Sequence, residues 1–253
     1  MTDSTQRFSD RVDAYVRFRP GYPPELVPDL LRITGCDSSA TVADFGSGTG
    51  IFTELLLQQG VEVYAVEPNQ PMRKAAQQRL GDNTRFHSID ASAERSGLQA
   101  ASLDLVTAAQ AFHWFNNDAA RDEFRRILKP RGQIALVWNR RDTSESFQQA
   151  YDQLLRELAP DYGKVNHMDL KPGQIARFFA DGAMQQLHYD YSQRLDFASL
   201  LGRLKSSSYC PREDSAHYIP LVNELLALFD RHAKDGYIDF DYATQVFVGP
   251  VNR

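Results

Sequence analysis

Short apolar runs alternate with segments of helical periodicity between residues 41 and 140. The apolar runs predict five strands, at Thr41–Phe45, Val61–Val66, Thr84–Ile89, Leu103–Ala109 and Gly132–Asn139. The segments between them predict helices at Phe52–Gln59, Pro71–Leu80 and Asn117–Leu128, with Asn69 as the cap of the second and Pro130 at the end of the third. Strands that alternate with helices indicate βαβ units, and therefore an α/β fold with a parallel sheet.

The flanking segments are less regular. A helix is predicted at Pro23–Thr34, after the Pro20–Gly21 break, and two more at residues 145–158 and 172–181. Further along, β-rich patterns at Met184–Leu195 and Tyr242–Val248 are separated by helical segments near 197–206 and 215–234. The simplest interpretation is a pair of late strands with a helical insertion near 197–236.

A glycine-rich turn, Asp44–Gly50 (DFGSGTG), follows the first strand and precedes the first helix of the core. Closely spaced glycines let the backbone approach a ligand, and ligands in open α/β sheets bind at the carboxyl ends of strands. The spacing is G-x-G-x-G, whereas a dinucleotide fingerprint is G-x-G-x-x-G, and the chain has no phosphate loop with a terminal Gly-Lys-Ser/Thr. The turn therefore argues against a nicotinamide oxidoreductase.

Two acids follow the next strands. Glu67 ends the second strand, where a carboxylate can accept both hydroxyls of a ribose, or can be an ordinary surface acid. Asp90, followed by Ala91, comes after the third strand, where it can accept from an adenine amino group or cap the next helix. We expect both acids at the ligand edge of the sheet.

The motifs DFGSGTG, VEP, IDA, LDLVTAAQAFHWF and RILKPRGQIALVW together resemble those of class I S-adenosylmethionine-dependent methyltransferases, over about residues 40–140. The chain is most similar to the small-molecule enzymes of the type 11 group, and within it to the trans-aconitate methyltransferase-like branch. The similarity to that branch adds YVRFRPGYP near the N-terminus, Ser206–Tyr209 and the closing Tyr242-x-Thr244. These additional motifs indicate which proteins are related to the chain more than they indicate its substrate.

The resemblance implies S-adenosylmethionine as cofactor and S-adenosylhomocysteine as its product. It implies that the turn passes around the methionine part of the cofactor, with Asp44 orienting the loop or accepting from the cofactor's amino group; the turn residues are Gly46, Ser47, Gly48 and Gly50. It also implies that Glu67 holds the ribose and that four residues meet the adenine: Pro68, Met72, Asp90 and Ala91. Gln110 follows the fourth strand, where this family offers a backbone carbonyl to the methionine amino group.

The implied fold is Rossmann-like, a seven-stranded, mostly parallel sheet that ends in an antiparallel hairpin and carries a helical lid. We expect residues 1–253 to form one domain, with an N-terminal cover (1–40), a cofactor-binding core (41–140) and a C-terminal part (141–253). The N-terminal segment of such enzymes commonly folds over the cofactor. Arg19 there can pair with the methionine carboxylate, and Tyr15 and Tyr22 are candidate contacts.

Methyl transfer from a sulfonium is an in-line displacement, which depends mainly on proximity and alignment in a dry pocket. A base is needed only when the nucleophile must lose a proton. His113, after the fourth strand, is the candidate catalytic base, with a pocket-wall or purely structural role as the alternatives. Trp114 and Phe115 are expected to pack rather than to catalyse, and they can form a wall of an apolar pocket.

Three residues are candidates for acceptor binding on the C-terminal side. Arg140 and Arg141 follow the fifth strand at the ligand end, and two guanidinium groups there suit an anionic, carboxylate acceptor. The alternative is a solvated turn in which Arg141 pairs with Asp142. Tyr209 lies in the insertion, from which it can reach the acceptor.

Charge and composition limit the class of protein. The 253 residues carry a net charge of −5, which disfavours bulk nucleic-acid binding, and Cys36 and Cys210 lack the spacing of a metal or redox motif. The longest stretch without charge has 13 residues, at Leu105–Asn117, and the N-terminus is polar, so we expect no membrane span, no signal peptide and a cytoplasmic protein.

The leading hypothesis is a methyltransferase of small molecules, EC 2.1.1.-, without a metal, that acts as a monomer or homodimer. A nucleic-acid methyltransferase is one alternative, although AQAFHWF stands where amino-directed enzymes carry N/D-P-P-Y/F. A non-catalytic protein that binds S-adenosylmethionine is the other. The acceptor atom, whether oxygen, nitrogen or carbon, stays open.

Overall fold

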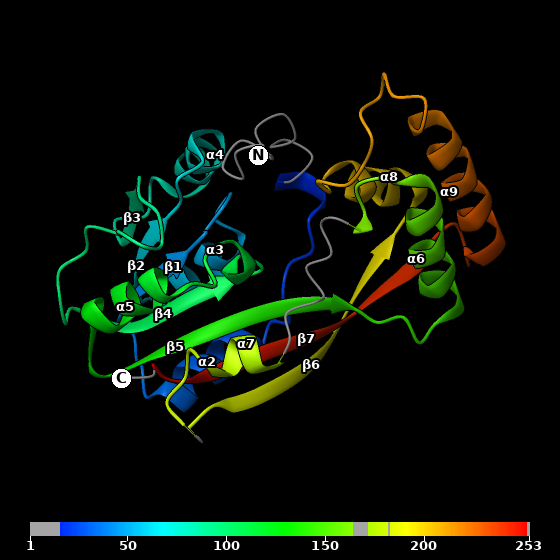
Figure 1. The fold of residues 1–253 in the computed structure, drawn as a ribbon. Coiled ribbons are helices and arrows are strands. Elements are labelled where there is room, and N and C mark those ends of the chain that lie inside the picture. Colours follow the sequence, from blue (N-terminus) through cyan, green and yellow to red (C-terminus); the bar gives the residue numbers. More distant parts are fainter. Residues whose placement is uncertain (1–15, 164–171, 182, 252–253) are drawn as a thin grey trace.

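A single seven-stranded sheet organises the described part of the chain. The computed structural model describes residues 16–163, 172–181 and 183–251. Its strands lie in the order β3-β2-β1-β4-β5-β7-β6 (Figure 1). Their bounds are β1 (Thr41–Phe45), β2 (Glu62–Val66), β3 (Phe86–Ile89), β4 (Leu103–Ala109), β5 (Leu128–Arg141), β6 (Gln185–Leu195) and β7 (Ile238–Pro250).

The direction of the strands divides the sheet into two parts. β1 pairs in parallel with β2 and β4, β2 pairs in parallel with β3, and β4 with β5. β7 runs antiparallel to both β5 and β6. The carboxyl ends of β1 to β5 therefore meet at one edge, the edge where open α/β sheets bind their ligands.

Helices cover both faces of the sheet. Apolar residues of α2 and α3 pack on one face with those of β1, β2 and β4, whereas α5 and the segment around α7 pack on the other, where Phe45 and Phe124 lie 4.8 Å apart by ring centroid. The helices of these layers are α2 (Leu26–Thr34), α3 (Ile51–Gln58), α4 (Gln70–Leu80), α5 (Asp118–Ile127), α7 (Pro172–Ala176) and the short 3-10 helix η3 (Phe112–Trp114).

A separate apolar cluster holds the remaining helices together. α6 (Ser146–Leu158), α8 (Phe197–Lys205) and α9 (Tyr218–His232) bury their apolar faces against each other and against the outer parts of β6 and β7. Figure 1 shows these three helices gathered at one end of the molecule, beside the ends of the long strands β5, β6 and β7. This cluster forms a wall at the end of the sheet that is remote from β3.

The predicted elements are confirmed in type and order, and so is the mostly parallel sheet with its antiparallel end. Asn69 caps α4 by accepting from the Met72 N–H, and Asn117 caps α5 in the same way from Ala120. The largest differences lie at boundaries: β5 begins at Leu128 rather than at Gly132 and runs through Pro130, and α7 ends at Ala176. No helix of the described residues is long and apolar enough to cross a membrane.

Candidate active site

One cavity of about 320 Å³ lies at the carboxyl edge of the parallel strands. Its walls come from the glycine turn after β1, from the segments after β2, β3 and β4, from the end of β5, and from α8 and its following loop. Residues far apart in sequence, such as Arg19 and Tyr242, line the same space. This is the size and position expected of a ligand site in an α/β fold.

The glycine turn opens its backbone toward the cavity at Gly48. Gly46, Gly48 and Gly50 all have positive φ, at 65°, 57° and 82°. A Cβ at Gly46 would lie 2.5 Å from the Cβ of Ala111, and one at Gly50 would lie 2.7 Å from Leu80, whereas a Cβ at Gly48 would meet only the Gly46 carbonyl oxygen, at 4.0 Å. The turn therefore leaves a cradle at Gly48 that a side chain would fill and a ligand can approach.

Glu67 is held rigidly beside this cradle. Its Oε2 accepts from the Gly48 N–H at 2.9 Å and its Oε1 from the Asn69 N–H at 2.8 Å. Burial raises the pKa of Glu67, and the two N–H groups and Arg73 offset this only in part. Each carboxylate oxygen has a further acceptor site, so the orientation suits a pair of ribose hydroxyls.

Asp44 lies under the turn rather than in the cavity. Its two carboxylate oxygens accept from the hydroxyls of Thr53, at 2.7 Å, and Thr107, at 2.9 Å. Burial raises the pKa of Asp44 to about 6, the two hydroxyls lower it, and the nearby Glu67 raises it. Asp44 therefore ties β1 to α3 and to β4, and its expected role of orienting the loop stays a prediction.

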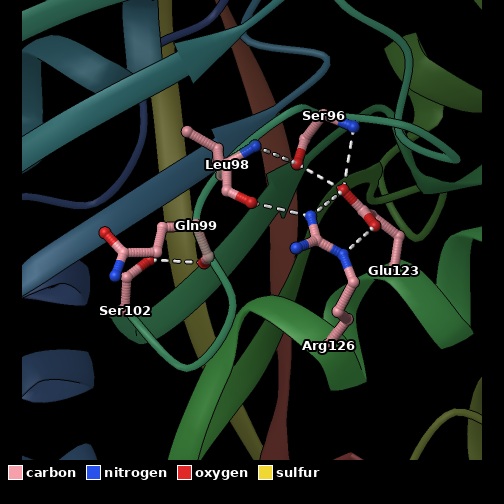
Figure 2. A network of polar contacts seen from close by, with 6 residues as sticks. All are labelled: Ser96, Leu98, Gln99, Ser102, Glu123 and Arg126. Carbon is pink, nitrogen blue, oxygen red and sulfur yellow. Dashed lines mark hydrogen bonds and ion pairs between the residues drawn. The ribbon is translucent and has the colours of Figure 1, made fainter.

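The segment after β3 forms one wall of the cavity with Ala91, Ser92, Ala93 and Glu94, and Met72 lines the same cavity. The segment that continues from this wall is tied to α5 by Glu123, which accepts from Ser96 N at 2.9 Å and from Ser96 Oγ at 2.5 Å (Figure 2). Arg126 donates to both Glu123 oxygens and to the Leu98 carbonyl. The Arg126 guanidinium lowers the pKa of Glu123 to about 2, assisted by Ser96, although burial opposes the shift.

The acid at the end of β3 has another partner. Asp90 accepts from Arg73 Nη2 at 2.6 Å, its side chain is 69% exposed, and it does not line the cavity. Arg73 also donates to the Glu67 carbonyl at 2.8 Å. Asp90 and Arg73 thus brace the segments after β2 and β3 from outside, while Ala91 forms the wall.

The segment after β4 narrows the middle of the cavity. Gln110 has a positive φ of 57°, which is rare for residues other than glycine, and its Nε2 donates to the Asn139 carbonyl at 3.0 Å. His113 and Trp114 follow in η3, with ring centroids 4.6 Å apart, and both line the cavity. The candidate base is therefore on the wall, as its sequence position predicts.

Aromatic and cationic side chains form the opposite end of the cavity. Arg141, at the end of β5, donates from Nη2 to Asp152 at 3.2 Å and to the Tyr162 hydroxyl, and its side chain is only 11% exposed. Tyr209 stacks edge-on with Tyr162 at 5.0 Å between ring centroids. Burial raises the pKa of Tyr209, but the nearby Arg141 and Arg203 outweigh it, so the pKa is lowered.

Arg203 is a second buried cation at this end. It projects from α8, is 8% exposed, and donates from Nε to the Tyr242 hydroxyl at 2.8 Å. Arg19, from the N-terminal segment, lines the same space and donates to the Ser206 carbonyl at 3.0 Å. The cavity therefore has carboxylates, Glu67 and Glu94, toward one end and guanidinium groups toward the other.

The cavity brings together most of the residues predicted from sequence. Those that line it are Arg19, Gly46, Gly48, Glu67, Pro68, Met72, Ala91, Gln110, His113, Trp114, Arg141 and Tyr209. Those that do not are Asp44, Ser47, Gly50, Asp90, Tyr22 and Arg140. Tyr22 packs on Phe52 at 5.0 Å, Arg140 is exposed, and Tyr15 lies outside the described residues.

Sequence reasoning missed several lining residues. They are Val66, Asn69, Ser92, Ala93, Glu94, Ala109, Ala111, Trp138, Asn139, Tyr162, Arg203 and Tyr242, whereas Phe115 is expected beside Trp114 and lines the cavity with it. Arg203 had a local signal, because it follows Leu200 by three positions on the buried face of its helix. Within the described ranges there is no group of three or more side chains suited to a metal ion.

Comparisons with known proteins agree with this geometry. Residues 43–136 match a family model described as a methyltransferase domain. An uncharacterized methyltransferase of Mycobacterium tuberculosis is 29% identical over 245 residues, which cover 96% of this chain and 94% of the relative. One of Schizosaccharomyces pombe is 26% identical over 247 residues, 95% of each chain.

Two solved structures show the same fold. A candidate type II methyltransferase from Anaeromyxobacter dehalogenans has a TM-score of 0.68 and 23% identity, over 92% of this chain and 98% of that one. Phosphoethanolamine N-methyltransferase 2 of Haemonchus contortus, in complex with S-adenosylmethionine, has a TM-score of 0.58 and 15% identity, over 99% of this chain and 59% of that one. The chain is thus similar to methyltransferases over nearly its whole length, residues 43–136 match a methyltransferase domain, and the sheet has the strand order of the methyltransferase fold.

Proposed function

We propose that the protein transfers the methyl group of S-adenosylmethionine to a small molecule that carries an anionic group. The observation that supports this most directly is the continuity of the cavity. The same space of about 320 Å³ is lined by Glu67 and Gly48 at one end and by Arg141 and Tyr209 at the other. A volume of this size lies within the range of small-molecule sites.

The cofactor end supplies binding and orientation. Glu67, with both oxygens fixed by backbone N–H groups, accepts from the ribose hydroxyls. Met72, Pro68 and Ala91 enclose the adenine, and the open cradle at Gly48 admits the methionine part of the cofactor. Gln110 offers its backbone carbonyl to the methionine amino group, and Arg19 pairs with the carboxylate.

Bound S-adenosylmethionine supplies a methyl group on a positively charged sulfur; the acceptor's lone pair forms the new bond to carbon, and the old bond's electron pair stays on sulfur. The protein's contribution is alignment and exclusion of water. His113 takes the proton when the nucleophile is a hydroxyl or an amine. His113→Ala would then slow transfer most at the pH values where wild-type imidazole is unprotonated; an unchanged pH–rate profile would limit His113 to the wall.

The acceptor end favours an anion. Arg141 and Tyr209 line it, with Trp114 as an apolar wall, and the lining acids lie toward the cofactor end. Phosphoethanolamine N-methyltransferase, a structural neighbour, acts by its name on a small molecule with a phosphate group. We further propose that the chain works as one domain, in the cytoplasm, as a monomer or homodimer.

The test uses methyl-labelled S-adenosylmethionine with the small-molecule, nucleic-acid and protein fractions of a cell extract. We expect label in small molecules that an anion exchanger retains. Arg141→Met should raise the acceptor concentration needed for half-maximal rate by at least tenfold, which is about 1.4 kcal/mol, while the affinity for S-adenosylhomocysteine stays unchanged. Its neighbour Arg140 is exposed, so Arg140→Met is the matched control.

Label confined to the nucleic-acid or protein fraction would refute the small-molecule acceptor. A complete lack of transfer with intact binding of S-adenosylhomocysteine would favour a non-catalytic binding protein. An equal change in the acceptor concentration for half-maximal rate in Arg140→Met and Arg141→Met would contradict the proposal that this end of the cavity binds an anion.

A further inference from the structure

Arg203 is buried, and within residues 16–163, 172–181 and 183–251 no carboxylate pairs with it. Its guanidinium lies over the rings of Tyr242 and Phe240, at 5.6 and 5.7 Å from the ring centroids, and its Nε donates to the neutral Tyr242 hydroxyl. Its Nη1 is buried without a hydrogen-bond partner among the described residues. A buried, unpaired cation costs stability, so the fold alone does not explain Arg203.

Arg141 repeats this arrangement on the other side of the same space. Its Nη1 is also buried and has no partner in the described part of the chain. Its carboxylate partner, Asp152, is shared with Arg156, whose Nε lies 2.7 Å from Asp152 Oδ2. Of the two cavity arginines, Arg141 thus shares its carboxylate with Arg156, the described residues provide none for Arg203, and each keeps an unused donor at a cavity wall.

The two arginines belong to one end of the site. Arg141 lies opposite Tyr242 in the pairing of β5 with β7, and Tyr242 is the hydrogen-bond partner of Arg203. The ribose acid, Glu67, follows β2, and β1 and β4 lie between β2 and β5. Three strand spacings of about 4.8 Å separate the ends of β2 and β5 by about 14 Å. The arginines thus lie beyond the cofactor end.

An anion held by two guanidinium groups is a poor site of methylation. Adding a methyl group to it would remove its negative charge, so these contacts would weaken as the reaction proceeds. Contacts stronger in the ground state than in the transition state raise the barrier. The penalty vanishes when the methyl group goes to a different atom of the acceptor, because the held anion then keeps its charge throughout.

We propose that Arg141 and Arg203 form an oxyanion subsite that anchors a carboxylate or phosphate group of the acceptor which is not itself methylated. This inference rests on the proposed function for the reaction. The acceptor then carries two groups: an oxyanion at the arginines and a nucleophile toward the cofactor. The nucleophile's lone pair forms the bond to the methyl carbon, and a hydroxyl or amine nucleophile gives its proton to His113.

The first test needs no acceptor. We expect Arg203→Met to melt at the same temperature as wild type or higher, because it removes an unpaired buried charge. With S-adenosylhomocysteine bound, succinate and methyl phosphate should each raise the melting temperature of wild type by mass action. In Arg203→Met, at least one of the two anions should have to be at least ten times more concentrated to raise the melting temperature by the same amount. Arg194 is an exposed arginine stacked on Tyr237 outside the cavity, so Arg194→Met should respond as wild type does.

The two probes separate the sources of the oxyanion, since a preference for succinate indicates a carboxylate and the reverse indicates a phosphate. Wild type unaffected by both probes, or Arg203→Met responding to both as wild type does, would overturn the subsite. Arg203→Lys, which keeps the charge without the planar fork, provides the weaker-binding variant if Arg203→Met does not fold.

The second test concerns the reacting atom. Acetate has only the group that the arginines hold, so incubation with labelled S-adenosylmethionine should yield no labelled methyl acetate. Formation of that ester, lost in Arg203→Met, would show that the anchored group itself is methylated and would overturn the inference. Binding of the anions without any methyl transfer to cell metabolites would leave the subsite standing and refute the proposed function instead.

Discussion

Gly48 provides the sharpest test of the cofactor site, because it lines the cavity and a Cβ there would touch no protein side chain. A Cβ at Gly48 would meet only the Gly46 carbonyl oxygen, at 4.0 Å. Gly46 and Gly50 are less suitable, since a Cβ at either would lie within 2.7 Å of another side chain. We therefore expect Gly48→Ala to fold and to lose affinity for S-adenosylhomocysteine.

The stability cost follows from the backbone. A residue other than glycine in the left-handed region costs about 1–2 kcal/mol, and replacing glycine stiffens the unfolded chain and returns about 0.4–1 kcal/mol. The net loss of about 1 kcal/mol lowers the melting temperature by about 2–4 °C in a domain of this size. The binding loss should be at least tenfold, or about 1.4 kcal/mol, because the added carbon occupies the space that the ligand needs.

Gly35 supplies the matched control. It ends α2 with a φ of 71°, and a Cβ there would meet nothing within 4 Å. Gly35→Ala should cost the same stability and leave the calorimetric Kd for S-adenosylhomocysteine unchanged. Wild-type affinity in Gly48→Ala, with the expected drop in melting temperature, would show that the turn is not where the cofactor binds.

Three further predictions follow from buried carboxylates. Glu67→Gln would set an amide N–H against the Gly48 or Asn69 N–H, and calorimetry should show at least tenfold weaker binding of S-adenosylhomocysteine, or about 1.4 kcal/mol; unchanged affinity would remove the ribose role. Glu123→Gln should loosen the wall after β3 and weaken adenosine binding. Asp122→Asn, which breaks an exposed ion pair on the same helix, should leave adenosine binding unchanged. An equal loss of adenosine affinity in both variants would contradict this. Asp44 has a pKa raised to about 6 in the fold, so the folded state binds more protons than the unfolded state between about pH 4 and 6, and stability falls as pH rises through that window by about 3 kcal/mol. Asp44→Asn should remove that part of the decline in urea denaturation, and an unchanged slope would contradict the burial argument.

The fold could be predicted because its core is built from local patterns. Most strands of the parallel part are apolar runs, and α4 and α5 begin at the side-chain caps Asn69 and Asn117. The start of β5 could not be predicted, since its early pairing, Leu103 with Leu128, precedes a register shift that lets Pro130 lie within the strand. A bulge of this kind depends on the neighbouring strand and leaves no local pattern.

The cofactor end of the site could likewise be predicted from the sequence, whereas the acceptor end could be predicted only in part. Gly48, Glu67 and Ala91 follow consecutive strands, so the strand order alone brings them together. Arg140 and Arg141 are adjacent in a strand and must point to opposite faces, so they could not both line a cavity. In the structure, Arg141 instead shares the cavity with Arg203, which lies 62 positions later in the chain. Arg203 reaches the cavity only because α8 packs against β6 and β7.

The N-terminal cover and the insertion are joined at the acceptor end, and this bears on how specificity is built. Phe18 packs directly on Gly202, where a Cβ would lie 2.4 Å from its ring, and Arg19 donates to the Ser206 carbonyl. Asn139 completes the link by donating to the Gly21 carbonyl at 2.8 Å and accepting from Thr244 at 2.7 Å. We therefore expect a substitution that reshapes the proposed acceptor pocket through α8 to act also on the N-terminal segment proposed to cover the cofactor. We expect acceptor choice and cofactor enclosure to be coupled through these contacts.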